Sequence, residues 1–240
     1  MILTSQTADW PSNMYASTLR PPIITRPHKD VVHMRFPDQK SLCHNFIRLT
    51  EFYEAPYPEI RGNYFKLDDY KRLYTVDHGR PFSYYKDWHG FNVPGRVVRA
   101  FAKTFAHDLT FEERRIVDLK PMAYLIGTWR DAELSHEMAH AMYHLSRRYR
   151  ETVRALVSKM WATDLWLKRT GDYGAFEKWL YKEGYTSGVI TDEFGAYFST
   201  NDLEDFSVDF SWRRAKALYR AAKPFRDLYA KIIRSPSWNA

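Results

Sequence analysis

The sequence ELSHEMAHAM occupies residues 133–142 and contains the pattern H-E-x-x-H. Residues four apart lie on one face of an α-helix, so His136 and His140 can direct their imidazoles at a single point. Neutral imidazole is a good ligand for zinc, and two such nitrogens supply half of a tetrahedral shell. Glu137 lies beside that point, where its carboxylate can act as a base on a water without binding the metal itself. The spacing therefore predicts two metal ligands and a general base within one short helical segment.

The residues around the motif favour a buried helix. A solvated helix would carry Lys and Glu beside the histidines, whereas the neighbours here are uncharged. These neighbours are Leu134, Met138, Ala139, Ala141 and Met142. We therefore expect a helix over residues 131–145 that packs into a core. The alternative is that the two histidines lie on an ordinary helix face and bind no metal.

The motif resembles that of the zincin metallopeptidases. Zincins with a histidine as third ligand continue as H-E-x-x-H-x-x-G-x-x-H, but here the last two fixed positions hold Tyr143 and Ser146. The gluzincin branch instead takes a glutamate from a later helix, often within E-x-x-A. Glu193, followed by Ala196, fits that pattern. The resemblance therefore implies that Glu193 is the third zinc ligand, on a helix over residues 191–200.

The residues around Glu193 suggest how that helix is placed. Gly195 and Ala196 are small, and we expect them to let it approach the motif helix closely. Asp192 could hold a ligand imidazole through its far N–H. Alternatively, Glu193 is an exposed carboxylate favoured by the helix dipole, and Asp192 is then the next candidate ligand.

A phenol near the metal could stabilise the oxyanion that forms during peptide hydrolysis. Tyr197 follows Glu193 by one turn and is the candidate, with Tyr143 and Tyr185 as equal rivals. For each of them the alternative is a packed aromatic without a catalytic role. His144 lies about 6 Å beyond His140 along the helix axis, too far to share one metal easily. We expect it to support the ligands or the fold.

Composition and charge place limits on the kind of protein. A chain of 240 residues is ample for a core, and 17% aromatic residues argue against disorder. No apolar run approaches the roughly 20 residues that span a bilayer, and residues 1–10 lack the pattern of a secretory signal. The single cysteine, Cys43, suits a reducing compartment and is expected to be buried and inert. These features predict a cytoplasmic protein.

We expect three parts in the chain. Residues 1–30 are rich in proline and lack periodicity. These features predict an N-terminal arm or a poorly ordered extension. Residues 31–120 form a mixed helix and strand part, and residues 121–240 form the metal-binding part, the two making one compact unit. In the first of these we expect a strand at 31–36, helices at 38–53, 68–74 and 95–106, a strand-like segment at 81–88 and a turn at 90–94. A capping box of Thr110 and Glu113 predicts one more helix, to about residue 119.

In the metal-binding part, residues 122–129 predict a strand directly before the motif helix. In zincins a sheet edge above the metal pairs with the extended substrate backbone. The predicted strand is either that edge or its neighbour. Further helices are expected at 147–168, with a possible break before them, and at 173–182.

Residues 212–233 predict a long amphipathic helix, which Pro224 could kink. One face is strongly basic, with Asp227 as its acid, and much of the net charge of +7 lies there. The basic residues are Arg213, Arg214, Lys216, Arg220, Lys223, Arg226, Lys231 and Arg234. This face would suit a nucleic acid or an acidic partner. The alternative is an ordinary solvated face.

The motif and its resemblance together imply an α+β fold: a helix-rich zincin-like domain with a small sheet next to the motif helix. The expected activity is zinc-dependent hydrolysis of peptide bonds in a protein or peptide substrate, with Zn²⁺ as cofactor. No membrane is expected as a partner. Two other hypotheses stay open. One is a nucleic-acid-associated protein that uses the basic helix, with a zinc site that is structural or acts on DNA-bound proteins. The other is a non-catalytic zinc-containing interaction module.

Overall fold

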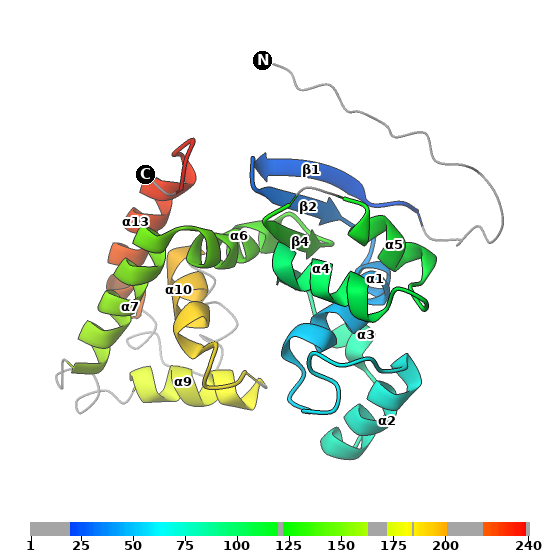
Figure 1. The fold of residues 1–240 in the computed structure, drawn as a ribbon. Helices are drawn as coiled ribbons and strands as arrows, with labels where there is room; N and C mark the ends of the chain where they lie inside the picture. The colour runs from blue at the N-terminus through cyan, green and yellow to red at the C-terminus, as the bar shows by residue number, and fades with distance from the viewer. Residues whose placement is uncertain (1–19, 120–121, 163–171, 184, 201–217, 239–240) are drawn as a thin grey trace.

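The computed structural model describes residues 20–119, 122–162, 172–183, 185–200 and 218–238 (Figure 1). The described helices are α1 (Gln39–Glu54), α2 (Leu67–His78), α3 (Tyr84–Asp87), α4 (Gly95–Thr104), α5 (Phe111–Val117), α6 (Ala132–Leu145), α7 (Arg147–Ala162), α9 (Asp172–Lys182), α10 (Ile190–Thr200) and α13 (Lys223–Ile233). The strands β1 (Ile23–His28), β2 (Val31–Arg35), β3 (Gly90–Pro94) and β4 (Tyr124–Thr128) form one sheet. The predicted α+β fold, helix-rich with a small sheet, is confirmed.

The sheet has the strand order β1-β2-β4-β3. Strands β2 and β4 are parallel, and the two outer strands pair antiparallel to their neighbours. Parallel strands need a long crossover, and here the crossover contains α1 to α5 as well as β3. The strand before the motif helix, β4, is therefore interior, and β3 is the edge strand beside it.

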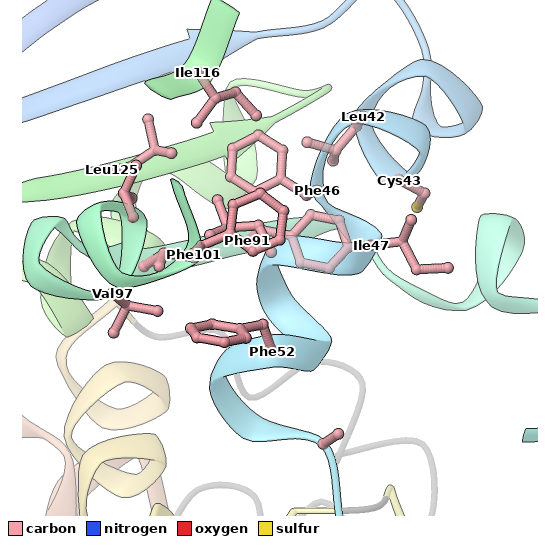
Figure 2. Close-up of a cluster of buried hydrophobic side chains, with 14 of the residues drawn as sticks. Leu42, Cys43, Phe46, Ile47, Phe52, Phe91, Val97, Phe101, Ile116 and Leu125 are labelled. Atoms are coloured by element: carbon pink, nitrogen blue, oxygen red, sulfur yellow. The ribbon is translucent and has the colours of Figure 1, made fainter. Parts of the chain in front are cut away.

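Along β2, β4 and β3 most residues on both faces of the sheet are buried, whereas β1 is mostly exposed, and side chains alternate between the two faces. Phe91 and Leu125 belong to one apolar cluster, which Phe46 of α1 joins (Figure 2). Tyr124 and Ile126 belong to a second cluster that contains residues of α6, α7 and α10. The motif helix α6 thus lies on the face of the sheet opposite to α1.

The motif helix and the helix that follows it lie where they were predicted. Helix α6 confirms the predicted span, and α7 begins after a break at Ser146.

Asp38 caps α1 by accepting from the backbone N–H of Ser41. Thr110 and Glu113 form the predicted capping box at the start of α5. These local signals are strong because each satisfies backbone N–H groups that a helix start leaves unpaired.

The N-terminal residues differ from the prediction. Residues 23–28, expected within an arm without regular structure, form the edge strand β1 and pair with β2. Proline is tolerated on an edge strand, since the edge leaves some N–H groups unused. Pro27 lies within β1, where the register with β2 shifts between Thr25 and His28. The rest of the predicted arm, residues 1–19, lies outside the described residues.

The segment before α4 also differs. Residues 81–88 do not form a strand: they contain the short helix α3. The strand is β3, at residues 90–94, where a turn was expected. The aromatic density in this segment reflects burial, since Tyr84 and Phe91 both lie in the core. Aromatic residues are frequent in cores as well as in strands, so composition alone misassigned the segment.

The C-terminal helix begins later than predicted. Residues 218–221 are helical, Ala222 is in a turn, and α13 starts at Lys223 with Pro224 in its first turn. Proline suits that position because it has no N–H to donate. Pro224 thus begins a helix where a kink was expected. Residues 212–217 of the predicted helix lie outside the described part of the chain.

Candidate metal centre

The two motif histidines and Glu193 come together where α10 packs on α6. The Nε2 atoms of His136 and His140 are 3.2 Å apart. The Oε2 atom of Glu193 lies 3.7 Å from the first of these nitrogens and 3.6 Å from the second. All three side chains are buried, with 3% to 9% of their surface exposed. Two imidazole nitrogens and a carboxylate oxygen, which are atoms that commonly bind zinc, therefore lie around one point.

The separations agree with the size of a zinc ion. Zinc binds nitrogen and carboxylate oxygen at about 2.0–2.2 Å, which in a tetrahedron puts neighbouring ligand atoms about 3.3–3.6 Å apart. The three distances here, 3.2, 3.6 and 3.7 Å, fall close to that range. The three residues form the metal-ligand cluster found among the described residues. The residues present fit the ion that the motif implies.

The charges of the cluster also favour a cation. Burial alone would lower the pKa of His140, but Asp192 and Glu193 outweigh it and raise that pKa to about 10. Burial raises the pKa of Glu193 to about 7, against the opposing effect of His140. Within the described residues, the buried Oε2 of Glu193 accepts no hydrogen bond. The surrounding carboxylates thus favour a positive charge in the cluster, and a metal ion and a proton would compete for that position.

Asp192 contacts His140 at Nδ1, the ring nitrogen that does not face the cluster. Its Oδ1 lies 3.1 Å from Nδ1 of His140, and its Oδ2 lies 3.5 Å from Nε2 of His144. Burial opposes ionisation of this carboxyl, yet His140 and His144 lower the pKa of Asp192. A proton held on Nδ1 leaves the Nε2 lone pair of His140 for the metal. Asp192 and His144 thus lie where support of the ligands was expected.

Glu137 lies on the side of α6 that faces the edge strand. Its Oε2 accepts a hydrogen bond of 2.7 Å from Nδ2 of Asn92 in β3. Burial raises the pKa of Glu137, and the opposing effects of His140, His136 and Asn92 limit the rise. A carboxylate with a raised pKa, next to a metal site, is suited to accept a proton from a water.

The three candidate tyrosines separate into two groups. The ring of Tyr197 lies against His136, with 4.6 Å between ring centroids. The hydroxyl of Tyr185 lies 3.5 Å from that of Tyr197. The hydroxyl of Tyr143 instead accepts a hydrogen bond of 3.1 Å from Nε of Arg154 in α7. Tyr197 and Tyr185 therefore lie beside the cluster, whereas Tyr143 is engaged elsewhere.

The reason given for the small residues of α10 needs correction. A Cβ atom at Gly195 would lie 2.9 Å from Cγ1 of Val153, which belongs to α7. Helix α10 does pack on α6 as expected, but Gly195 permits close packing of α10 on α7. Ala196 is buried, with 1% of its surface exposed. The position of Glu193 on α10 therefore depends on packing against both α6 and α7, and not on α6 alone.

Three residues near the site were not predicted. Asn92 and Gly90 contact the Glu137 carboxylate from β3, a segment expected to be a turn. Glu54, the last residue of α1, keeps solvent access, yet surrounding protein and the charges of Glu193 and Glu137 raise its pKa to about 7. The pattern H-E-x-x-H carries no signal for any of them, because their proximity arises from packing across the sheet.

The basic C-terminal face is described only in part. Arg213, Arg214 and Lys216 lie outside the described residues. Lys223 pairs with Asp227 at 2.6 Å, as an exposed pair, and such pairs contribute little to stability. Lys231 and Arg234 are exposed. The nucleic-acid hypothesis for this face stays a hypothesis.

No protein-family model matches the chain, and no curated protein or solved structure matches it either. The likeness to zincins therefore depends on the motif and on the cluster described above. None of the described helices combines the length and apolar character that a membrane span requires.

Proposed function

We propose that the chain is a zinc-dependent peptidase in which His136, His140 and Glu193 hold the ion and Glu137 is the general base. The observation that carries the proposal is the convergence of two imidazole nitrogens and a carboxylate oxygen, 3.2 to 3.7 Å apart, beside a second buried carboxylate. A zinc ion at this point would activate a water and polarise the scissile carbonyl. The single free cysteine, Cys43, is buried and fits a cytoplasmic location.

Glu137 is suited to move a proton during hydrolysis. It takes a proton from the attacking water and delivers it to the leaving nitrogen, which needs a carboxyl that is neither strongly acidic nor permanently protonated. Burial raises the pKa of Glu137 above its ordinary value, which makes its carboxylate a stronger base towards the attacking water. Tyr197, whose ring lies against His136, and Tyr185 offer hydroxyl groups beside the cluster. Either could donate to the developing oxyanion.

The edge strand β3 supports a peptide substrate. Its inner edge pairs with β4, and no other described strand pairs with its outer edge. An extended peptide can add to such an edge through main-chain hydrogen bonds, which suit many sequences. Asn92 of this strand touches Glu137, so a peptide added there would lie close to the proposed base. The substrate class that fits is an extended segment of a protein or peptide.

The proposal is tested with zinc-loaded protein and a mixture of quenched fluorescent peptides. The wild type should cleave members of the mixture. Glu137→Gln should lower turnover at least about 100-fold, the usual contribution of a general base, while zinc content stays unchanged. Glu151→Gln on the exposed face of α7 is the matched control and should keep full turnover.

Two results would contradict this function. Zinc-loaded wild type that cleaves no peptide would favour the non-catalytic zinc module. Equal turnover in Glu137→Gln and the wild type would remove Glu137 from the mechanism.

A further inference from the structure

Asn92 connects the sheet to the carboxylate of Glu137. The hydroxyl of Tyr124, in β4, donates a hydrogen bond of 2.6 Å to Oδ1 of Asn92. Nδ2 of the same amide donates a bond of 2.7 Å to Oε2 of Glu137. The side chains form one chain of hydrogen bonds from an interior strand, through an edge strand, to the motif helix.

The direction of these bonds fixes the orientation of the amide. An amide oxygen only accepts and an amide nitrogen only donates, so a flipped Asn92 would lose both bonds. Burial raises the pKa of Tyr124 well above its ordinary value, so its hydroxyl remains a donor. Tyr124 has no exposed surface and lies opposite Pro94 in the sheet. The anchor of the chain is therefore the rigid interior of the fold.

Gly90 restricts the other oxygen of the same carboxylate. A Cβ atom at Gly90 would lie 2.2 Å from Oε1 of Glu137. Gly90 and Asn92 are two residues apart on β3, so they share a face of the strand. One strand thus contacts both carboxylate oxygens, Oε2 through a donor and Oε1 through the space that glycine leaves.

We propose that Asn92, oriented by Tyr124, is a positioning residue that holds the Glu137 carboxylate beside the metal cluster. This inference rests on the proposed function, since it assigns Asn92 to the reaction for which Glu137 is the base. A charge-assisted hydrogen bond to a buried carboxylate limits its rotation and holds Oε2 on the Asn92 amide. Oε1, for which Gly90 leaves room, is then the oxygen that accepts the proton. The strand that suits the substrate backbone therefore also aligns the base.

The test uses full-length protein loaded with Co²⁺, which favours the same nitrogen and oxygen ligands as zinc and has a visible spectrum. The probe is acetohydroxamate, a chelating acid that shares its proton with a neighbouring carboxylate when it binds the metal. Its affinity, measured from the change in the cobalt spectrum, reports whether Glu137 is in position.

Asn92→Asp is the informative variant, because it keeps the side-chain shape and the acceptor for Tyr124 but replaces the donor to Glu137 with a carboxylate that repels it. We expect cobalt to bind as in the wild type and acetohydroxamate affinity to fall about tenfold or more, the usual effect of losing a hydrogen bond to a charged group. Tyr124→Phe keeps the amide but frees its orientation and should cause a smaller loss. The control Tyr149→Phe, whose hydroxyl contacts Ser199 instead, should cause none, and neither should Asn63→Asp on the surface.

The outcomes separate this inference from the proposed function. Wild type that binds no metal overturns both. Metal binding with equal acetohydroxamate affinity in Asn92→Asp and the wild type overturns the positioning role alone. Loss of cobalt in Asn92→Asp also overturns it, since Asn92 would then support the ligands. If Asn92→Asp does not fold, Tyr124→Phe decides: unchanged affinity overturns the role and a loss supports it.

Discussion

Glu51 and Glu193 are both buried glutamates, but their surroundings differ. Glu193 faces two imidazoles, so its charge has partners in the cluster. Glu51 lies in α1 with 6% of its surface exposed. Burial raises the pKa of Glu51 to about 8, and the neighbouring Tyr84 and Tyr70 offset only part of that rise. With a pKa of about 8, folded Glu51 is mostly protonated at neutral pH.

This difference predicts how stability depends on pH. Unfolded Glu51 ionises near its ordinary pKa of 4.5, whereas folded Glu51 holds its proton to about pH 8. The folded state binds more protons in that window, so the contribution of Glu51 to the free energy of unfolding falls as pH rises from about 4.5 to about 8. Glu51→Gln, which cannot ionise, should show a flatter dependence.

Urea unfolding of the wild type and Glu51→Gln at pH 5, 6.5 and 8 measures the effect. The difference between the two proteins should shift in favour of the variant as pH rises. The exposed Glu59→Gln serves as control and should follow the wild type. Parallel curves for Glu51→Gln and the wild type would show that Glu51 does not carry this dependence.

Some residues of the site could be predicted from the sequence and others could not. His136, Glu137 and His140 were predictable because helical periodicity is local and their spacing places them by itself. Glu193 required a family pattern, since 53 positions separate it from His140. Asn92 and Gly90 could not be predicted, because their contact with Glu137 depends on the register of β3 against β4.

Helix α10 carries Glu193, and its placement depends on Gly195. The atom that an added Cβ would meet, Cγ1 of Val153, belongs to a β-branched side chain that is stiff in a helix. Gly195→Ala should therefore shift α10 and destabilise the protein by about 1–3 kcal/mol, the cost of overpacking. Zinc affinity should fall as well, because Glu193 moves with the helix.

The double variant Gly195→Ala with Val153→Ala tests the cause. Removing the valine methyl groups makes room for the new Cβ. The double variant should therefore lose less stability than the sum of the two single losses, by about 1 kcal/mol or more. Gly188→Ala is the control, since its nearest atom is 4.0 Å away. Chemical unfolding and zinc titration measure both quantities. Simple additivity would show that Val153 does not limit α10.

The predicted elements that held were those with strong local signals. The capping box of α5 and the periodicity of α1 each act within a few residues. β1 and β3 were missed for a shared reason. Both are edge strands with few ladder hydrogen bonds, so they tolerate the proline and glycine that otherwise mark turns. Their pairing is long-range and leaves little trace in the local sequence.

For the whole molecule, composition predicted a folded chain, and the motif with its resemblance to the zincins implied the α+β class. The topology was less accessible, because the parallel pairing of β2 with β4 joins residues 31–35 to residues 124–128. That pairing places α1 and α6 on opposite faces of one sheet and puts β3 next to α6. The site therefore combines a local motif, a distant helix and an edge strand.

The most direct test is the zinc content of protein purified without added zinc, measured by mass spectrometry. The wild type and Glu137→Gln should each contain about one zinc ion per chain, as expected for a site with three protein ligands. His136→Ala and Glu193→Ala should lose most of it. Zinc retained in Glu193→Ala would move the third ligand elsewhere, with Asp192 as the next candidate. Wild type that holds no zinc, even after zinc is supplied, would contradict the metal centre and the function built on it.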